Sequence, residues 1–303
     1  MRLKFRAVAI MILVLGGAWT CGGPAIAGQS QELLPEQSAA KAKQVLQQVI
    51  TALGGQAYLN VRDSECVGRI WQPVPVGSRP DTTDFRDLWL LPDKNRTEYA
   101  VKREQTILQF MMGSEEARFA PGSATVVVFA GSGGWILDSK KHVENEPEDL
   151  VSAFNEQVKS DMNNMLRKRM NEPGVDVQYG GTDIIDLREA EWIEFTDSDR
   201  REMRLGIDQH THLPMRWVVA TRNPDTRERT EVIMSYTQYM ALDGVKTPLS
   251  LELSRNDHKL SQTFLTECKY NSSLDPQLFT RAALEQRAAE VTKKGSKDSK
   301  STK

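Results

Sequence analysis

Alternating apolar and polar residues form the most regular pattern in the second half of the chain. Leu249, Leu251 and Leu253 are separated by polar residues, so their side chains share one face of an extended segment. Similar segments follow one another between positions 191 and 270, joined by short links such as Asp243-Gly244, which is a strong hairpin signal. The links are too short for crossover helices, so the pattern predicts an antiparallel, meandering sheet.

Three segments show apolar residues at helical spacing instead. The first, positions 35–55, ends at Gly54-Gly55, and glycine is typical of a helix C-terminus. The third, positions 275–290, begins with Asp275 as its N-cap and Pro276 at the first helical position. The second, positions 146–174, has acids near its start and bases near its end, which suits the helix dipole. It carries an apolar residue at every fourth position: Leu150, Phe154, Val158, Met162, Leu166 and Met170.

The earlier half of the chain also has strand-like segments, with less regular alternation, around a glycine-rich stretch. The sequence VVVFAGSGGWIL places Gly131, Gly133 and Gly134 between two apolar runs. A phosphate-binding loop needs a lysine and a hydroxyl residue directly after its glycines, at the start of a helix. Here Trp135 and an apolar run follow and Lys140 comes too late, so the stretch predicts a hairpin turn between two strands.

The two ends of the chain have compositions unlike the rest. Residues 1–27 have a basic start, a short apolar stretch and the small residues Ala25 and Ala27, which together predict a signal peptide cleaved after Ala27. A lipoprotein anchor at Cys21 is the alternative, but the residues before this cysteine fit a lipoprotein signal badly. Residues 292–303 are polar and rich in lysine, so we expect a disordered basic tail. The sequence thus predicts an exported protein.

Charge and cysteine content narrow the class of protein further. The formal net charge of the 303-residue chain is −2, whereas nucleic-acid binders carry a strongly basic face. Cys66 and Cys268 remain after the predicted cleavage, and in an oxidising compartment they are able to pair. Such a bond would close a loop of roughly 200 residues and constrain the unfolded chain by about 4–5 kcal/mol. Two separate buried thiols are an equally good interpretation.

Candidate chemistry is sparse. Asp208, His210 and His212 would lie on one face of a strand, and two imidazoles with a carboxylate are able to bind zinc. The same residues also fit a solvated turn between two strands, and we prefer that interpretation. Three acidic pairs are further suspects for acid–base catalysis, but nothing in their surroundings singles one out. They are Glu115-Glu116, Asp183 with Asp186, and Asp197 with Asp199.

Four stretches, taken in order, resemble the outer-membrane lipoprotein-sorting (LolA-like) superfamily. They are TALGGQAYLNV, GSGGWIL, the hairpin IDQHTHLPMRW, and SYTQYMALDGVKTPLSLEL. The resemblance implies an α+β fold, in which an open, strongly curved antiparallel β half-barrel has helices packed in or over its concave face. It implies one domain over residues 28–291 in the periplasm. Better-known members bind acyl chains of lipoproteins or lipids in an apolar hollow, and no catalytic residue or cofactor is implied.

These observations lead to a functional hypothesis of transport or sensing without catalysis. We expect a periplasmic carrier or sensor that binds lipid or lipoprotein acyl chains, without a cofactor, and that has envelope proteins as further candidate partners. The alternatives are an envelope protein-interaction module whose hollow is filled by its own helices, and a metal-dependent hydrolase that uses Asp208, His210 and His212. The residues predicted to line the hollow are Phe154, Val158, Met162, Leu166, Met203, Leu205, Trp217, Met234, Leu249 and Leu251.

Overall fold

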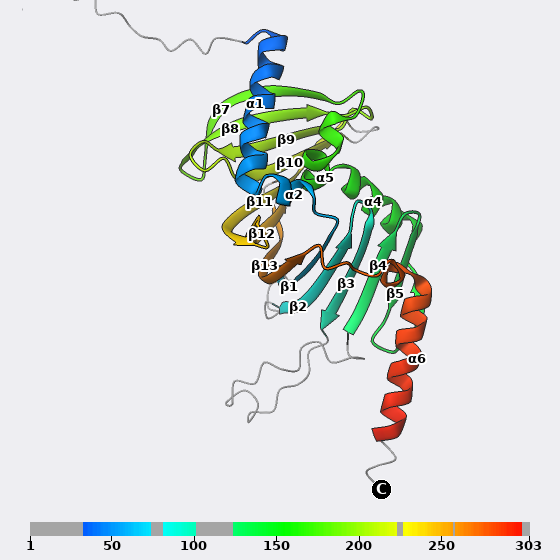
Figure 1. Cartoon of the computed structure of the whole chain (residues 1–303). Coiled ribbons are helices and arrows are strands. Elements are labelled where there is room, and N and C mark those ends of the chain that lie inside the picture. Colours follow the sequence, from blue (N-terminus) through cyan, green and yellow to red (C-terminus); the bar gives the residue numbers. More distant parts are fainter. Residues whose placement is uncertain (1–32, 74–80, 101–123, 223–226, 257, 299–303) are drawn as a thin grey trace, which may run out of the picture. The chain divides into compact units, whose positions relative to one another are not determined.

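The computed structural model describes residues 33–73, 81–100, 124–222, 227–256 and 258–298 (Figure 1). From Leu34 onwards the chain forms one compact unit. The predicted signal peptide with Ala27 and Cys21, the acidic pair Glu115-Glu116 and the last residues of the predicted tail lie outside the described residues. Within the described ranges, no helix is long and apolar enough to cross a membrane.

An antiparallel sheet dominates the fold, as the alternating pattern predicts. In the described part of the chain it has 13 strands in the order β6-β5-β4-β3-β2-β1-β13-β12-β11-β10-β9-β8-β7. Each neighbouring pair is consecutive in sequence except β1 and β13, and β6 and β7 form the edges of the open sheet. The strands are β1 (Asp63–Gln72), β2 (Asp81–Leu90), β3 (Lys94–Ala100), β4 (Ala124–Ala130), β5 (Gly133–Leu137), β6 (Val143–Asn145), β7 (Asp176–Ile185), β8 (Arg188–Thr196), β9 (Glu202–Asp208), β10 (Pro214–Arg222), β11 (Arg229–Leu242), β12 (Val245–Arg255) and β13 (His258–Tyr270).

The helices lie at both ends of the chain and in the middle. The predicted first helix is confirmed, and Gly54 follows it in a conformation (φ +124°) that favours glycine. The helices are α1 (Pro35–Leu53), α2 (Gln56–Leu59), α4 (Glu148–Lys159), α5 (Met162–Arg167) and α6 (Arg281–Asp298), with short 3-10 turns η1 (Arg169–Asn171) and η2 (Pro276–Phe279).

The second predicted helix is wrong as one continuous element, because the chain breaks between α4 and α5. Asp161 is the N-cap with which α5 begins, and its carboxylate accepts a hydrogen bond of 2.8 Å from the backbone N–H of Asn164. Residues four apart advance by roughly 40° around an ideal helix, so a long every-fourth stripe cannot keep facing one sheet. The break turns Met162 and Leu166 back to the core, while Leu150 remains exposed.

The third predicted helix also divides, into η2 and α6. Asp275 caps η2 as expected, accepting a hydrogen bond from the backbone N–H of Gln277, and the chain then changes direction at Thr280. Beyond that point α6 continues to Asp298, past Thr292, where the sequence predicts disorder. Lysine and threonine do not stop a helix that has already formed, since extending a helix costs much less than starting one.

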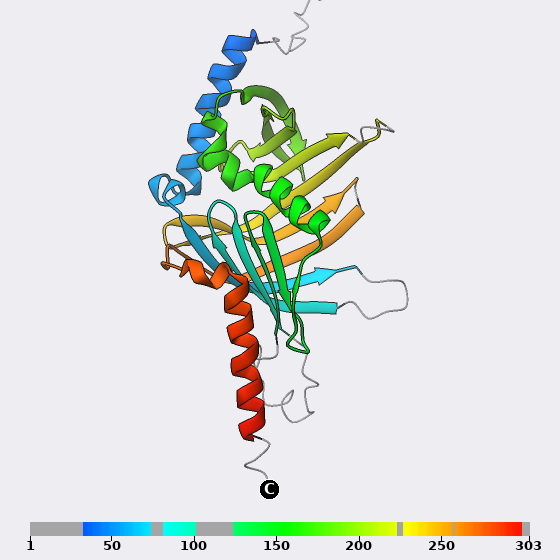
Figure 2. The same cartoon turned by 90° about the vertical axis from the view of Figure 1, so that its right-hand side faces the viewer.

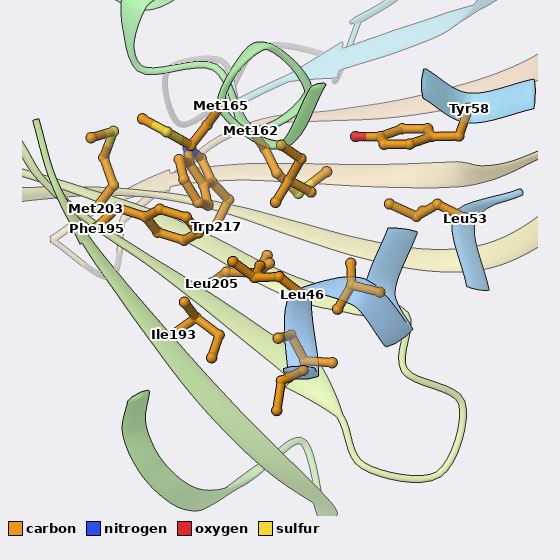
Figure 3. Close-up of a cluster of buried hydrophobic side chains, with 14 of the residues drawn as sticks. Leu46, Leu53, Tyr58, Met162, Met165, Ile193, Phe195, Met203, Leu205 and Trp217 are labelled. Carbon is orange, nitrogen blue, oxygen red and sulfur yellow. The ribbon is translucent and has the colours of Figure 1, made fainter. Parts of the chain in front are cut away.

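Helices α1 and α5 cover the inner face of the sheet, which we define as the face that they contact. Figure 3 shows this core, in which Met165 from α5 lies next to Trp217 and Leu46 from α1 lies next to Leu205. Its buried members on the strands are Ile193, Phe195, Met203, Leu205, Ile207, Trp217, Tyr236 and Val245. The opposite, outer face is covered by η2 and α6, where Phe279 and Leu284 pack on Leu88, Val126, Val128 and Leu137.

The glycine-rich stretch is the hairpin turn between β4 and β5, as predicted. Gly131 has a φ of +58°, a conformation that glycine adopts readily, and a Cβ there would meet open space. Gly134 has a different role, because it lies where α4 approaches the sheet. A Cβ at Gly134 would lie 2.8 Å from a methyl carbon of Val151 and 2.9 Å from the ring of Phe129.

Replacing the two glycines therefore has different consequences. Gly134→Ala forces Val151 or Phe129 to move, so we expect a loss of about 1–3 kcal/mol in the free energy of unfolding. Gly131→Asn is the control, because asparagine tolerates the left-handed conformation, and we expect a loss below about 1 kcal/mol. Urea unfolding of both variants measures the difference. Equal losses would contradict this account of the hairpin.

Cys66 and Cys268 form a disulfide bond across β1 and β13, which is one of the two alternatives that the sequence left open. They are direct partners in the register of the two strands, and 202 positions separate them in the sequence.

Removing the bond by the double change to alanine frees a long loop in the unfolded state. We expect a loss of about 4–5 kcal/mol in unfolding free energy, measured by denaturant unfolding. Reduced wild-type protein should match the variant, and a variant as stable as the oxidised protein would contradict the prediction.

Candidate functional site

A cavity of about 450 Å³ lies on the inner face, where the strands near the two ends of the chain meet. Its walls come from β1–β3 and β11–β13, and α2, the end of α4 and α5 also line it. Figure 3 shows part of this lining, with Leu53, Tyr58 and Met162. Most lining side chains are apolar or aromatic. The apolar ones include Leu53, Ile70, Phe85, Trp89, Leu91, Met162, Met234, Val245, Leu251 and Leu265.

Helix α4 covers the end of this region with few contacts. Phe154 is the buried residue among the 12 of α4. Its ring stacks on Phe129, with ring centres 4.7 Å apart, and on Trp89, with ring centres 5.8 Å apart. On the solvent side, Arg201 forms an ion pair of 2.7 Å with Glu156. The stacking of Phe154 and the ion pair of Arg201 with Glu156 thus contribute to holding α4, which runs beside the sheet in Figure 2.

A polar cluster lies under α5 at one side of the cavity. The Tyr58 hydroxyl donates a hydrogen bond of 3.0 Å to the side-chain oxygen of Asn163. Arg167 donates through Nε to the Tyr58 carbonyl and lies over the Tyr58 ring, 4.4 Å from its centre. Burial raises the pKa of Asp161, although Asn164 and Arg167 oppose the shift. Arg167 is therefore close enough to Asp161 to favour its charged form.

A second carboxyl group, Asp87 on β2, also lines the cavity. Its Oδ1 accepts hydrogen bonds of 2.8 Å from the side chains of Asn95 and Thr97, and its Oδ2 accepts one of 2.7 Å from the Trp89 indole. Burial raises the pKa of Asp87, and these three donors oppose the shift. Sequence reasoning missed Asp87, although an acid that alternates with Phe85 and Trp89 on one strand face was the available signal.

The predicted lining residues fall into three groups. Met162, Met234 and Leu251 line the cavity. Leu166, Met203, Leu205 and Trp217 belong to the core under α1 and α5, and the Trp217 indole donates a hydrogen bond of 2.7 Å to the carbonyl of Ser160. Phe154 plugs the end of α4, Val158 is half-buried on the same helix, and Leu249 is half-buried on β12 but does not line the cavity.

The residues of the metal candidate have structural contacts in the turn between β9 and β10. Asp208 accepts hydrogen bonds from the backbone N–H groups of His210 and Thr211 and pairs with Arg188, so its carboxylate stabilises the β9–β10 turn. His212 takes a left-handed conformation (φ +56°) in this turn instead of extending a strand. Among the described residues, no group of three or more histidine, cysteine or acidic side chains is placed to hold a metal ion.

The two acidic pairs within the described residues have structural contacts. Asp197 accepts hydrogen bonds from the backbone N–H groups of Asp199 and Arg201 and forms an ion pair of 2.7 Å with Arg201. Asp183 accepts a hydrogen bond from the backbone N–H of Ile184. Asp186, in the turn between β7 and β8, forms an ion pair with Arg216 of β10. Both pairs lie outside the cavity lining.

The architecture has counterparts among solved structures. No protein-family model and no curated protein matches this chain. A DUF1329 family protein from Desulfovibrio piger matches at 12% identity and a TM-score of 0.51, over 80% of this chain and 98% of its own. A domain assigned to the outer membrane lipoprotein-sorting proteins, from Vibrio parahaemolyticus, matches at 13% identity and a TM-score of 0.50, over 80% and 99%. The chain has a LolA-like fold. At these identities the likeness concerns the fold alone and does not extend to a ligand.

The raised pKa of Asp161 predicts a pH dependence of stability. The folded protein keeps the Asp161 proton above the ordinary aspartate value of 3.8, where the unfolded chain has released it. The contribution of Asp161 to the stability of the wild-type protein therefore falls as pH rises through the window between the two values. An asparagine side chain cannot ionise and is still able to cap α5, so Asp161→Asn should gain stability relative to wild type across that window.

Urea unfolding between acidic and neutral pH measures this difference. Asp149→Asn, at an exposed position on α4, is the matched control and should follow the wild-type curve. If Asp161→Asn loses stability relative to wild type as pH rises, the carboxyl group is stabilised as an anion and the account of this cluster is wrong.

Proposed function

We propose that this protein is a non-catalytic binding protein of the cell envelope that holds an acyl chain of a lipid or lipoprotein in the inner-face cavity. The observation that carries the proposal is the cavity itself. It measures about 450 Å³ and its walls are mainly apolar and aromatic. Small-molecule sites in proteins typically span about 300–1,000 Å³ and combine such walls with a few polar groups.

Binding of this kind needs no chemical step. An acyl chain that enters the cavity gains about 0.8 kcal/mol for each methylene removed from water. Helix α4 is suited to admit the chain, because Phe154 is its buried residue and stacks on Trp89 of the cavity wall. When α4 moves away, an acyl chain takes the place of Phe154 against the ring of Trp89. Transfer would then consist of exchange between α4 and the ligand.

The proposed location rests on the pattern at the N-terminus and on the fold. The signal peptide predicted over residues 1–27 directs export, and we propose the periplasm as the destination. The Vibrio parahaemolyticus protein of the same fold is assigned to outer membrane lipoprotein sorting. Both observations favour a role in the envelope, with lipid or lipoprotein acyl chains as partners.

The alternative role is an envelope interaction module whose inner face is filled by its own helices. Its support is that Met203, Leu205 and Trp217 pack under α1 and α5 instead of lining the cavity. On this alternative the remaining cavity has no ligand, and the sheet serves as a rigid support for a protein partner. Direct measurement of ligand binding separates the two roles.

Leu251 and Leu249 provide a matched test of acyl binding on one strand. Leu251→Trp puts a larger side chain into the cavity, so we expect affinity for a fluorescent acyl probe to fall by about tenfold or more, as expected when several methylenes lose their place. Leu249→Trp adds the same volume outside the cavity lining and should change affinity less than about threefold.

Probe titrations, together with native mass spectrometry of protein purified from its own compartment, provide the measurements. Unfolding curves for both variants show whether either change disturbs the fold, since extra volume in a packed region costs about 1–3 kcal/mol. Absence of probe binding to wild-type protein, with no co-purified lipid, would contradict the carrier and favour the interaction module.

A further inference from the structure

Asp87 lies on the cavity wall with cavity-lining neighbours along its own strand and on both adjacent strands. On β2, Phe85 precedes it and Trp89 follows it on the same face. In the strand register Asp87 is opposite Cys66 of β1 on one side and Thr97 of β3 on the other. All of these residues line the cavity. A carboxyl group therefore lies amid a mainly apolar wall and faces the space that a ligand would fill.

The hydrogen bonds of Asp87 fix its orientation without satisfying its charge. The three donors, on Asn95, Thr97 and Trp89, are all neutral, and two of them bind Oδ1. An ionised carboxylate accepts about four hydrogen bonds, so Oδ2 retains an acceptor position. Among the described residues, no lysine or arginine forms an ion pair with Asp87, and its pKa is raised chiefly by burial.

The other charged groups of the cavity do not offset Asp87. Asp161 has Arg167 beside it, and that guanidinium is also engaged by the carbonyl and ring of Tyr58. Lys246 of β12 lines the cavity but is exposed. Asp87 is half-buried, and a carboxylate that has lost much of its water without gaining a cation is costly, so a cation of the ligand would reduce that cost. The charge that Asp87 lacks as a partner is therefore positive.

Aromatic rings on both sides of Asp87 favour the same kind of ligand. Phe85 lies opposite Tyr99 of β3, and Trp89 lies on the far side of Asp87 along β2. Aromatic faces carry negative charge density and attract ammonium groups, with tryptophan the strongest of the three. Trp89 is held by its hydrogen bond to Asp87, so carboxylate and ring form one rigid unit.

We infer that the cavity takes an amphiphile whose polar end carries a cationic amine, with the ammonium group bound to Asp87 and the alkyl chain along the apolar wall. This inference rests on the proposed function and adds the class of headgroup to it. An ammonium group donates to the open position on Oδ2 and lies beside the rings of Phe85, Trp89 and Tyr99. A carboxylate at the same place would face Asp87 directly, and like charges there disfavour binding.

Three probes with the same alkyl chain test the headgroup: dodecylamine, dodecanol and dodecanoate. Calorimetric titration of the exported protein at neutral pH, below the micelle concentration of each probe, gives the affinities. We expect dodecylamine to bind about tenfold or more tightly than dodecanoate, with dodecanol between them, since hydrogen bonds to charged groups are the stronger ones. In Asp87→Asn this preference should disappear, whereas Asp149→Asn, at an exposed position on α4 outside the cavity lining, should retain it.

The outcomes separate this inference from the proposed function. If dodecanol or dodecanoate binds as tightly as dodecylamine, or if Asp87→Asn keeps the preference for the amine, the inference is overturned while acyl binding stands. If none of the three probes binds wild-type protein, the proposed function fails and the inference fails with it. Should Asp87→Asn not fold, the order of the three affinities in wild-type protein decides the matter by itself.

Discussion

The pairing of β1 with β13 is the contact on which the rest of the sheet depends. These are the first and last strands, and without their pairing the sheet would separate into β1–β6 and β7–β13. The cavity draws its walls from both parts, so it exists only when this pair has formed. The partners lie far apart in sequence, which makes closure of the intervening chain costly. The disulfide between Cys66 and Cys268 holds the register at this point.

Carboxyl groups on the two faces of the same strands have different partners. On the outer face, Glu98 forms ion pairs of 2.8 Å with Arg96 and 2.7 Å with Arg287 of α6. Burial alone would raise the pKa of Glu98, but the two guanidinium groups hold it below its usual value. On the inner face, Asp87 has neutral donors. Glu98, which α6 covers, thus has cationic partners, whereas Asp87, which faces the cavity, has neutral hydrogen-bond donors.

Phe154, Trp89 and Asp87 link the cover of the cavity to its wall. The chain breaks at Asp161, so α4 runs in a different direction from α5, and Phe154 of α4 stacks on Trp89. The indole N–H of Trp89 donates a hydrogen bond to Asp87. A ligand that displaces Phe154 therefore meets the ring whose position Asp87 sets. Phe154 of α4, Trp89 and Asp87 therefore contact one another in that order, from the covering helix to the cavity wall.

The sequence by itself determined the antiparallel sheet, the first helix, and the turns at Gly131 and Asp243-Gly244, because alternation and turn residues act over a few neighbouring positions. Only the tertiary structure decided the break at Asp161, the pairing of the cysteines and the division of apolar residues between core and cavity. Met203 and Leu251 follow the same alternation, yet α1 and α5 cover the first and leave the second facing open space. That difference depends on contacts between distant segments, which no local period records.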